Sequence, residues 1–292
     1  MPSSNDRSTV AHKILTYSGL FFILSLVLIP FGYIGISAFK SPMEMFEVKW
    51  WPDDWSLDAW RYILFDLKFH LYLFNSFLAG LGAAVIALFV AVPGAYIFGR
   101  KQFWGKNTFF YIITLAMLFP FVLLVVPLTI IWIDIGLYDT MAGLWIAYQV
   151  FILPFGIWML RGFFAELPPS LEECVMVYGC TQFQAFYRVM LPLAKPVIVS
   201  LLFLSFLIGW SDFLFSNMLT TGDGPRTSSV IIYNTAVGGE RVEWELMMVM
   251  TLMAGIPPVI LYILAQQQLM KTFAVENIDG SESMACSGSI QS

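Results

Sequence analysis

The residues that most often carry enzyme chemistry are few in this chain and lie far apart. Its two histidines, His12 and His70, are distant in sequence, and its three cysteines lack the even spacing of a disulfide framework or a metal site. The chain contains no H-E-x-x-H or G-x-S-x-G motif and no pair of carboxylates within an apolar run. The sequence therefore predicts neither a metal site nor an enzyme.

One run, from Gly99 to Asn107, partly matches a phosphate-binding loop. It has five residues between its glycines instead of four, lacks Ser or Thr after Lys106, and follows a long apolar run rather than a short strand. We interpret it as a basic loop and expect no cofactor bound by this chain.

The elements around these residues are long apolar helices. The chain has 292 residues, of which 59% are hydrophobic and 12% charged, and its mean hydropathy is +0.76. A membrane-spanning helix needs about 20 mostly apolar residues. Six runs meet that length, which predicts an all-α, polytopic membrane protein: 14–39, 73–98, 109–133, 141–160, 197–217 and 246–269.

The distribution of positive charge predicts the orientation of these spans. Nine of the 15 lysines and arginines fall in the two tails and in the loops after the second and fourth spans. The positive-inside rule then places both termini in the cytoplasm. We therefore expect a cytoplasmic tail at 1–13, a six-helix transmembrane domain at 14–269 and a second cytoplasmic tail at 270–292.

Two segments on the opposite side are long enough to hold structure. Ser56 is a candidate N-cap for a short helix in the first of them. The second, from Leu219 to Glu245, contains the turn signal Gly222 to Pro225 and is expected to be a loop.

The most informative stretch is the cytoplasmic loop at 166–195. Pro168 and Pro169 are expected to stop the preceding helix. Ser170 and Glu173 have the S-x-x-E spacing of a capping box, which predicts the start of a short helix.

A second short helix is expected directly after the first. Gly179 is a natural C-terminal stop, and Thr181 with Gln184 has the T-x-x-Q spacing of another capping box. Pro192 is expected to end this second helix. The loop therefore predicts a helix, a sharp turn and a helix.

Both short helices carry apolar side chains, but neither is long enough to span a bilayer. Such a surface needs a partner, and two alternatives follow from the residues alone. The loop packs against its own spans and the lipid headgroups, or it binds another protein.

The loop also resembles a known motif. The run Glu173 to Val175, Gly179 after three residues, and Val189 to Pro192 after nine more are similar to the EAA loop (E-A-A-x3-G-x9-I-x-L-P) of permease subunits of ABC importers. Phe186, Arg188 and residues 193–196 most resemble the carbohydrate-importer branch, the shorter permease of the maltose-type pair. The chain departs from the pattern at Cys174, Val175, Tyr178 and Cys180, which makes the first helix bulkier.

The resemblance implies that this loop is a coupling element seated in a groove of a separate ATPase subunit, which would bind ATP and Mg. The residues that would carry coupling are Glu172, Glu173, Val175, Met176, Tyr178, Gly179, Phe183, Phe186, Arg188 and Pro192. The implied partners are a second permease subunit forming a heterodimer, two ATPase subunits and an extracytoplasmic solute-binding protein. Lipid is expected around the spans, and nucleic acid is not.

Candidates for a transport path lie inside the fourth and fifth spans. Asp212 is the clearest ionisable residue within a span, and because a charge in hydrocarbon is costly, its presence there suggests a function. Aromatic faces and amide groups bind sugar rings, so the other candidates are Trp210, Phe213, Asn217, Tyr148 and Gln149. For any one of these, ordinary packing is the favoured alternative.

The sequence thus predicts a permease subunit of an ATP-driven importer of sugars or oligosaccharides in a bacterial inner membrane. The alternatives are an ion-gradient-driven secondary transporter, an ABC importer for a non-sugar solute and a membrane-embedded enzyme. An ion-driven transporter would be supported by inverted repeats and by ionisable residues near the midplane of the membrane. Neither feature is evident in the sequence.

Overall fold

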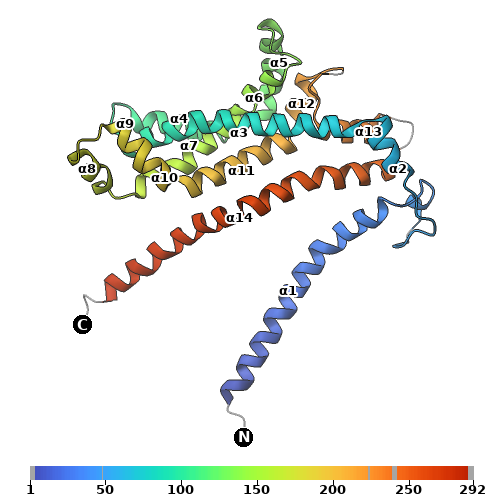
Figure 1. The fold of residues 1–292 in the computed structure, drawn as a ribbon, viewed down its shortest axis with the longest axis horizontal. Coiled ribbons are helices and arrows are strands. Elements are labelled where there is room, and N and C mark those ends of the chain that lie inside the picture. The colour runs from blue at the N-terminus through green and yellow to red at the C-terminus, as the bar shows by residue number, and fades with distance from the viewer. Residues whose placement is uncertain (1–3, 48, 223, 239–241, 289–292) are drawn as a thin grey trace. The chain divides into compact units, whose positions relative to one another are not determined.

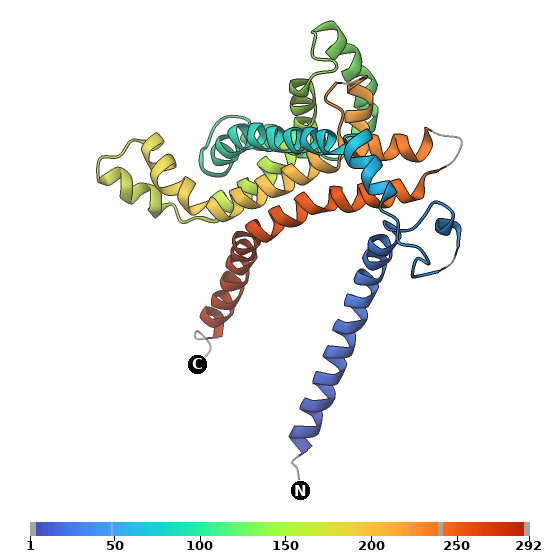
Figure 2. The same cartoon turned by 45° about the vertical axis from the view of Figure 1, so that its right-hand side comes forward.

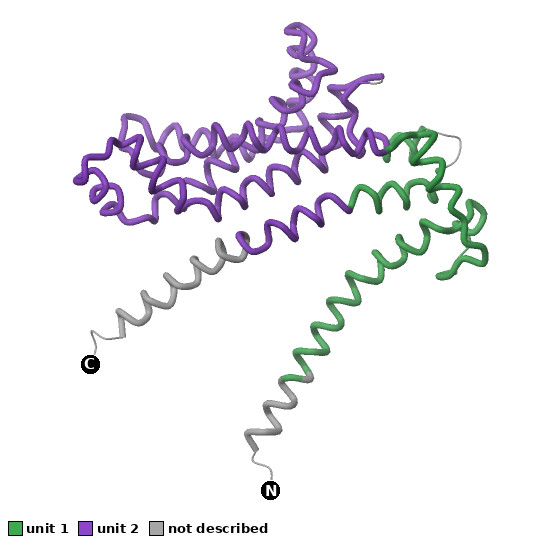
Figure 3. The backbone as a smooth tube through the Cα atoms, in the orientation of Figure 1, with its two compact units in different colours: residues 1–69, 232–255 green, residues 70–231, 256–292 purple. Residues whose placement is uncertain are grey.

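The computed structural model describes residues 4–47, 49–222, 224–238 and 242–288, with side chains from residue 15 to residue 268 and at Lys13. Within these ranges the chain consists of helices and connecting loops, without a strand. It forms two compact units, residues 1–69 with 232–255 and residues 70–231 with 256–292 (Figure 3). The predicted all-helical architecture is confirmed.

Three helices are long and apolar enough to cross a membrane alone. They are α1 (Ser4–Ser37), α3 (Phe69–Arg100) and α14 (Trp244–Gly288), and Figure 1 shows each as one continuous ribbon. Three pairs of shorter helices each pass the same test but are bent by more than 40°. The described residues therefore contain up to six candidate spans, three continuous and three bent.

The bends interrupt spans that the sequence predicts as single runs. α4 (Lys106–Ala116) is followed by the 3-10 helix η3 (Phe121–Leu124) and by α5 (Val125–Asp134), at an angle of 88° (Figure 2). Pro120 causes this break, because it has an extended ψ of 96° and disfavours helical conformation in the residue before it.

The fourth predicted span consists of α6 (Met141–Ala147) and α7 (Gln149–Glu166), which meet at Tyr148 with a bend of 44°. The fifth predicted span, 197–217, is wrong at its far end. There α11 (Lys195–Ser211) stops, Asp212 is extended, and α12 (Leu214–Leu219) follows as a separate helix.

Helix α3 lies at the centre of the larger unit and contributes alanines to three buried clusters. Its Gly80 meets Gly209 of α11 so closely that a Cβ on Gly209 would lie 2.8 Å from the Gly80 Cα. Small residues at such crossings let helix backbones approach closely, which is how membrane helices gain packing energy without a hydrophobic driving force.

The segment 219–245 is not the simple loop that its turn signal predicts. It contains α13 (Ser228–Val237), whose start is held by buried hydroxyl groups. The hydroxyls of Ser76 and Ser228 lie 2.8 Å apart, and Thr227 Oγ1 lies 2.9 Å from Ser216 Oγ. These contacts join residues distant in the chain, so they could not be predicted from local sequence.

The smaller unit holds the segment between the first two spans. It contains η1 (Glu44–Phe46), α2 (Asp58–Arg61) and the π-helix η2 (Tyr62–Asp66). The Ser56 hydroxyl accepts a hydrogen bond from the Asp58 N–H at 3.1 Å, but α2 begins at Asp58 with Leu57 as its N-cap. The predicted cap at Ser56 is thus one residue too early.

Candidate functional site

The loop at 166–195 begins where the sequence predicts. α7 ends at Glu166, Leu167 is extended, and α8 (Ser170–Val177) follows the two prolines. The predicted S-x-x-E box is wrong, because Pro169 already has helical dihedral angles and is itself the N-cap, which places Ser170 inside the helix. A capping side chain must stand on an extended residue just before the helix.

The turn after α8 is a Schellman motif. Gly179 has a φ of +86°, its N–H donates to the Met176 carbonyl at 2.9 Å, and the Cys180 N–H donates to the Val175 carbonyl at 3.3 Å. The left-handed conformation favours glycine because it lacks a Cβ. The predicted C-terminal stop at Gly179 is confirmed.

The second capping box is also confirmed. The Gln184 N–H donates to Thr181 Oγ1 at 3.3 Å, and the Thr181 N–H donates to Gln184 Oε1 at 2.9 Å. This box starts α9 (Gln182–Ala185), which continues into the π-helix η4 (Phe186–Met190) and α10 (Leu191–Leu193).

Pro192 does not end the second helix as predicted. The wider π-turn before it, with the Leu191 N–H bonded to the Phe186 carbonyl, accommodates the missing proline donor. The helix instead ends at Ala194, where the segment 182–193 meets α11 at 72°. Pro192 lies two residues before that corner.

The loop has an apolar outer face. Val177 and Tyr178 are each 85% exposed, Phe183 is 76% exposed and Tyr187 is 62% exposed. We call these four residues the exposed loop face. Val177 and Tyr187 are not among the predicted coupling residues, although Tyr187 follows Phe183 by four residues, the spacing that places two side chains on one side of a helix.

The inner face of the loop packs on the larger unit. The Phe186 ring lies 4.6 Å from the Tyr96 ring, and Met190 is fully buried in the same cluster as Phe164. Figures 1 and 2 show α8 and α9 at one end of this unit. Phe186, a predicted coupling residue, therefore holds the loop in place and does not face outward.

The remaining predicted coupling residues are distributed over both faces. Glu173, Arg188 and Pro192 are exposed and Val175 and Met176 are half-buried, whereas Glu172 is buried. Its carboxylate forms an ion pair with Arg100, with Oε1 3.1 Å from Nε, and lies 3.5 Å from Lys101 Nζ. Arg100 is a residue that the sequence interpretation missed, because 72 residues separate it from Glu172.

The predicted path residues lie near the bend at Tyr148 and the end of α11. The Tyr148 ring, at the α6–α7 bend, is fully buried and lies 6.0 Å from the Phe151 ring and 6.5 Å from the Phe215 ring. Phe121, just after the α4 break, lies 5.7 Å from Phe151. Asp212 interacts electrostatically with the Tyr148 hydroxyl, and its Oδ2 accepts the Ser216 N–H at 3.0 Å.

Two of these candidates are occupied by structural contacts. The Gln149 amide donates to the carbonyls of Ala83 and Trp145, and Trp210 is buried and stacked on Phe206 at 5.6 Å. Phe213 directly precedes α12 and Asn217 lies within it, and both are partly exposed. The structure thus brings Tyr148 and Asp212 together and uses Gln149 and Trp210 for packing.

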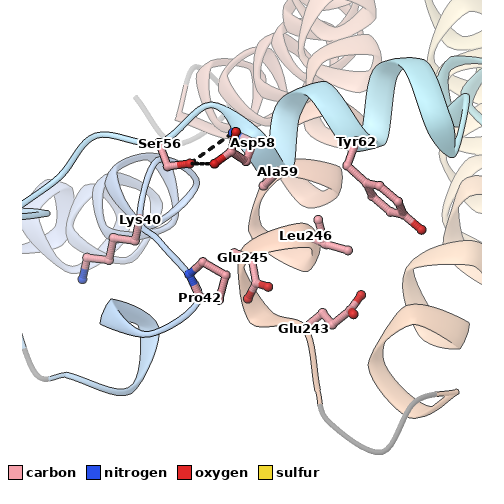
Figure 4. A pocket seen from close by; sticks show the side chains of 9 residues that line it. All are labelled: Lys40, Pro42, Ser56, Asp58, Ala59, Tyr62, Glu243, Glu245 and Leu246. Carbon is pink, nitrogen blue, oxygen red and sulfur yellow. Dashed lines mark hydrogen bonds between the residues drawn. The ribbon is translucent and has the colours of Figure 1, made fainter.

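A hollow of about 310 Å³ lies in the smaller unit, and Figure 4 shows it from close by. Asp58, Glu243 and Glu245 contribute carboxylates to it, and Lys40 lies at its other side. None of its lining residues is a predicted site residue, and among the described residues no three metal-ligating side chains gather anywhere. The loop at 166–195 therefore remains the candidate site.

Comparison with known proteins identifies the chain. Residues 85–271, which include the whole loop, match the family model of the binding-protein-dependent transport system inner membrane component. The chain belongs to this family. The permease is therefore an inner-membrane subunit of an ABC transporter and not itself an enzyme, as predicted. Its membership excludes the ion-driven transporter and the membrane-embedded enzyme that the sequence left as alternatives.

Curated relatives resemble the permease over most of its length. It is 28% identical to the inner membrane ABC transporter permease protein YcjP of Escherichia coli, over 90% of this chain and 95% of that protein. It is 34% identical to the trehalose transport system permease protein SugB of Mycobacterium tuberculosis, over 73% of this chain and 77% of that one.

A solved structure shares the fold. It belongs to a bacterial ABC transporter involved in the import of the acidic polysaccharide alginate, with a TM-score of 0.77 and 23% identity. The match covers 92% of this chain and 99% of that one.

Proposed function

We propose that the permease docks on an ATPase subunit through its exposed loop face and that ATP hydrolysis there drives import of a sugar or oligosaccharide. The observation that carries the proposal is the loop itself: its outer side holds four exposed apolar or aromatic side chains, while its inner side is anchored in a buried cluster. Exposure of such an apolar face to water costs free energy, so exposed apolar patches commonly mark protein interaction sites. A face that is held in place by a buried cluster can bind a protein partner without first becoming ordered.

The energetics support a docking role. Full burial of a large apolar side chain contributes about 1.5 to 3 kcal/mol. Four such side chains on one face can offset part of the cost of association. Glu173 and Arg188, both exposed on the same loop, would supply polar contacts at the margin of the interface.

The proposed substrate class comes from the relatives. These relatives include permeases of trehalose transport, of diacetylchitobiose uptake and of sulfoquinovosyl glycerol transport. We propose that part of the path is lined by Tyr148, at the bend between α6 and α7, and by Asp212, Phe213 and Asn217, which follow the end of α11. A second, different permease subunit would complete the path. ATP and Mg would be bound by the ATPase partner, and both termini would lie in the cytoplasm.

One experiment tests the proposal. The tagged permease is co-expressed with its transport subunits, extracted in mild detergent, and its co-purifying chains are identified by mass spectrometry. The complex is then reconstituted in liposomes with the binding protein, and ATP hydrolysis is measured beside uptake of trehalose, diacetylchitobiose and acidic oligosaccharides. We expect an ATPase subunit, a second permease and ATP-dependent sugar uptake.

Three outcomes would contradict it. Absence of an ATPase subunit from the wild-type complex overturns the docking role, and ATP-driven uptake of only non-sugar solutes overturns the substrate class. Gly179→Pro provides the loop control, since proline cannot adopt the positive φ of this turn. Normal coupling in that variant would also contradict a role for the loop.

A further inference from the structure

Arg100 joins three helices at the point where the loop leaves the membrane domain. It is the last residue of α3, and its side chain is 8% exposed. Its Nε donates to Glu172 Oε1 at 3.1 Å, and its two terminal nitrogens donate to the carbonyl oxygens of Leu167 and Pro168. One guanidinium therefore contacts the residues just after α7 and the first turn of α8.

The charges match the electrostatics of all three helix ends. A helix carries partial negative charge at its C-terminus and partial positive charge at its N-terminus. Arg100 stands at the C-terminal end of α3 and beside that of α7, whereas Glu172 stands in the first turn of α8. The cation and the anion each occupy the favourable end, and the guanidinium also binds the carbonyl oxygens of the two residues that directly follow α7.

Lys101 extends the same arrangement toward the second half of the loop. Its Nζ lies 3.5 Å from Glu172 Oε2 and 5.1 Å above the Tyr96 ring, and that ring packs on Phe186. The loop is thus fixed to α3 at two places, through charge at α8 and through aromatic packing at η4. The contacts of Glu172 lie on the inner side, away from the exposed loop face.

We propose that Arg100 and Glu172 are positioning residues that lock the loop to α3, so that the loop and the cytoplasmic end of α3 move as one body. When the ATPase partner displaces the loop, the motion then reaches α3, the helix at the centre of the membrane unit. This inference rests on the proposed docking of the loop on the ATPase subunit.

A direct test removes the negative charge of the Glu172 side chain and keeps its shape. Glu172→Gln is assembled in the complete transporter and reconstituted, and solute imported per ATP hydrolysed is measured. We expect the ATPase subunit to remain bound and the ratio of transport to hydrolysis to fall about fivefold, within the range of measured coupling effects. Glu166→Gln is the matched control, because Glu166 is exposed at the end of α7 and has no ion pair among the described residues.

A second test uses a covalent link in place of the ion pair. Arg100 and Glu172 are both changed to Cys in a chain whose three natural cysteines are replaced by Ser, and a short bifunctional maleimide joins the two positions. We expect the unlinked pair to couple poorly and the link to restore the ratio. This arm decides the question even where Glu172→Gln assembles poorly, since the linked and unlinked forms are the same protein.

The outcomes separate this inference from the proposed function. A wild-type chain without an ATPase partner contradicts the proposed function. A wild-type complex that imports solute, beside a Glu172→Gln complex with an unchanged ratio, overturns only the positioning role. A link that blocks transport would also overturn it, because the loop and α3 would then have to separate during the cycle.

Discussion

Gly80 of α3 and Gly209 of α11 form a close crossing of two helices, since a Cβ on Gly209 would come within 2.8 Å of the Gly80 Cα and one on Gly80 within 2.8 Å of the Phe206 carbonyl oxygen. Backbone atoms cannot yield as a flexible side chain does. The crossing therefore depends on both glycines.

Substitution at this crossing should destabilise the permease. We expect Gly209→Ala to lower the free energy of unfolding by about 1 to 3 kcal/mol, as over-packing typically does. Thermal unfolding in detergent measures the effect. Gly94→Ala in α3, the partner helix at this crossing, is the control, because its added Cβ would meet Ile157 at an ordinary 3.7 Å. Equal melting temperatures for the two variants would contradict the crossing.

The two candidate capping boxes should respond differently to alanine. Thr181→Ala removes a hydrogen bond to the Gln184 N–H and should cost about 1 kcal/mol. Ser170→Ala should cost much less, because Ser170 lies inside α8 and makes no capping bond. Hydrogen exchange of loop amides measures the difference. Faster exchange in the Ser170 variant than in the Thr181 variant would show that the box at Ser170 forms after all.

The turn at Gly179 should tolerate few side chains. Gly179→Ala places a Cβ at a φ of +86°, which costs roughly 1 to 2 kcal/mol for an L-residue. We expect weaker binding of the ATPase subunit, measured by co-purification at increasing dilution. Gly162→Ala in α7, where the added Cβ meets nothing within 4 Å, serves as the matched glycine. If Gly162→Ala weakens binding as much, the turn is not the cause.

The exposed loop face should contain the main docking residues. We expect Phe183→Ala to weaken association with the ATPase subunit about tenfold, a loss common for a central aromatic residue in an interface. Binding of the purified ATPase subunit to the permease in nanodiscs measures it. Trp104→Ala is the comparison, since Trp104 is 92% exposed in the basic loop between α3 and α4. A tenfold loss from both substitutions would indicate a general surface effect.

Local signals predicted much of the loop but not its connections. Gly179 and Thr181 were predicted correctly because a Schellman stop and a capping box depend on neighbouring residues. Ser170 was misassigned because Pro169 can itself begin a helix, so an S-x-x-E spacing there is ambiguous. The bend at Tyr148 is not marked by a glycine or proline at the junction of the two helices, so local sequence gives no signal for it. The Arg100–Glu172 pair joins residues far apart in the chain, so it follows from tertiary packing.

The corner at Ala194 sets the direction in which a movement of the loop would act on α11. Because α11 departs at 72° from the segment 182–193, a push along that segment acts mostly across α11 rather than along it. The 17 residues of α11 make an arm of about 25 Å at 1.5 Å per residue. If the loop, α3 and α11 turned together by about 10° about this corner, the far end of such a rigid arm would move by about 4 Å. The break at Asp212 lies at that end, so under the proposed docking a small displacement of the loop would become a larger displacement there.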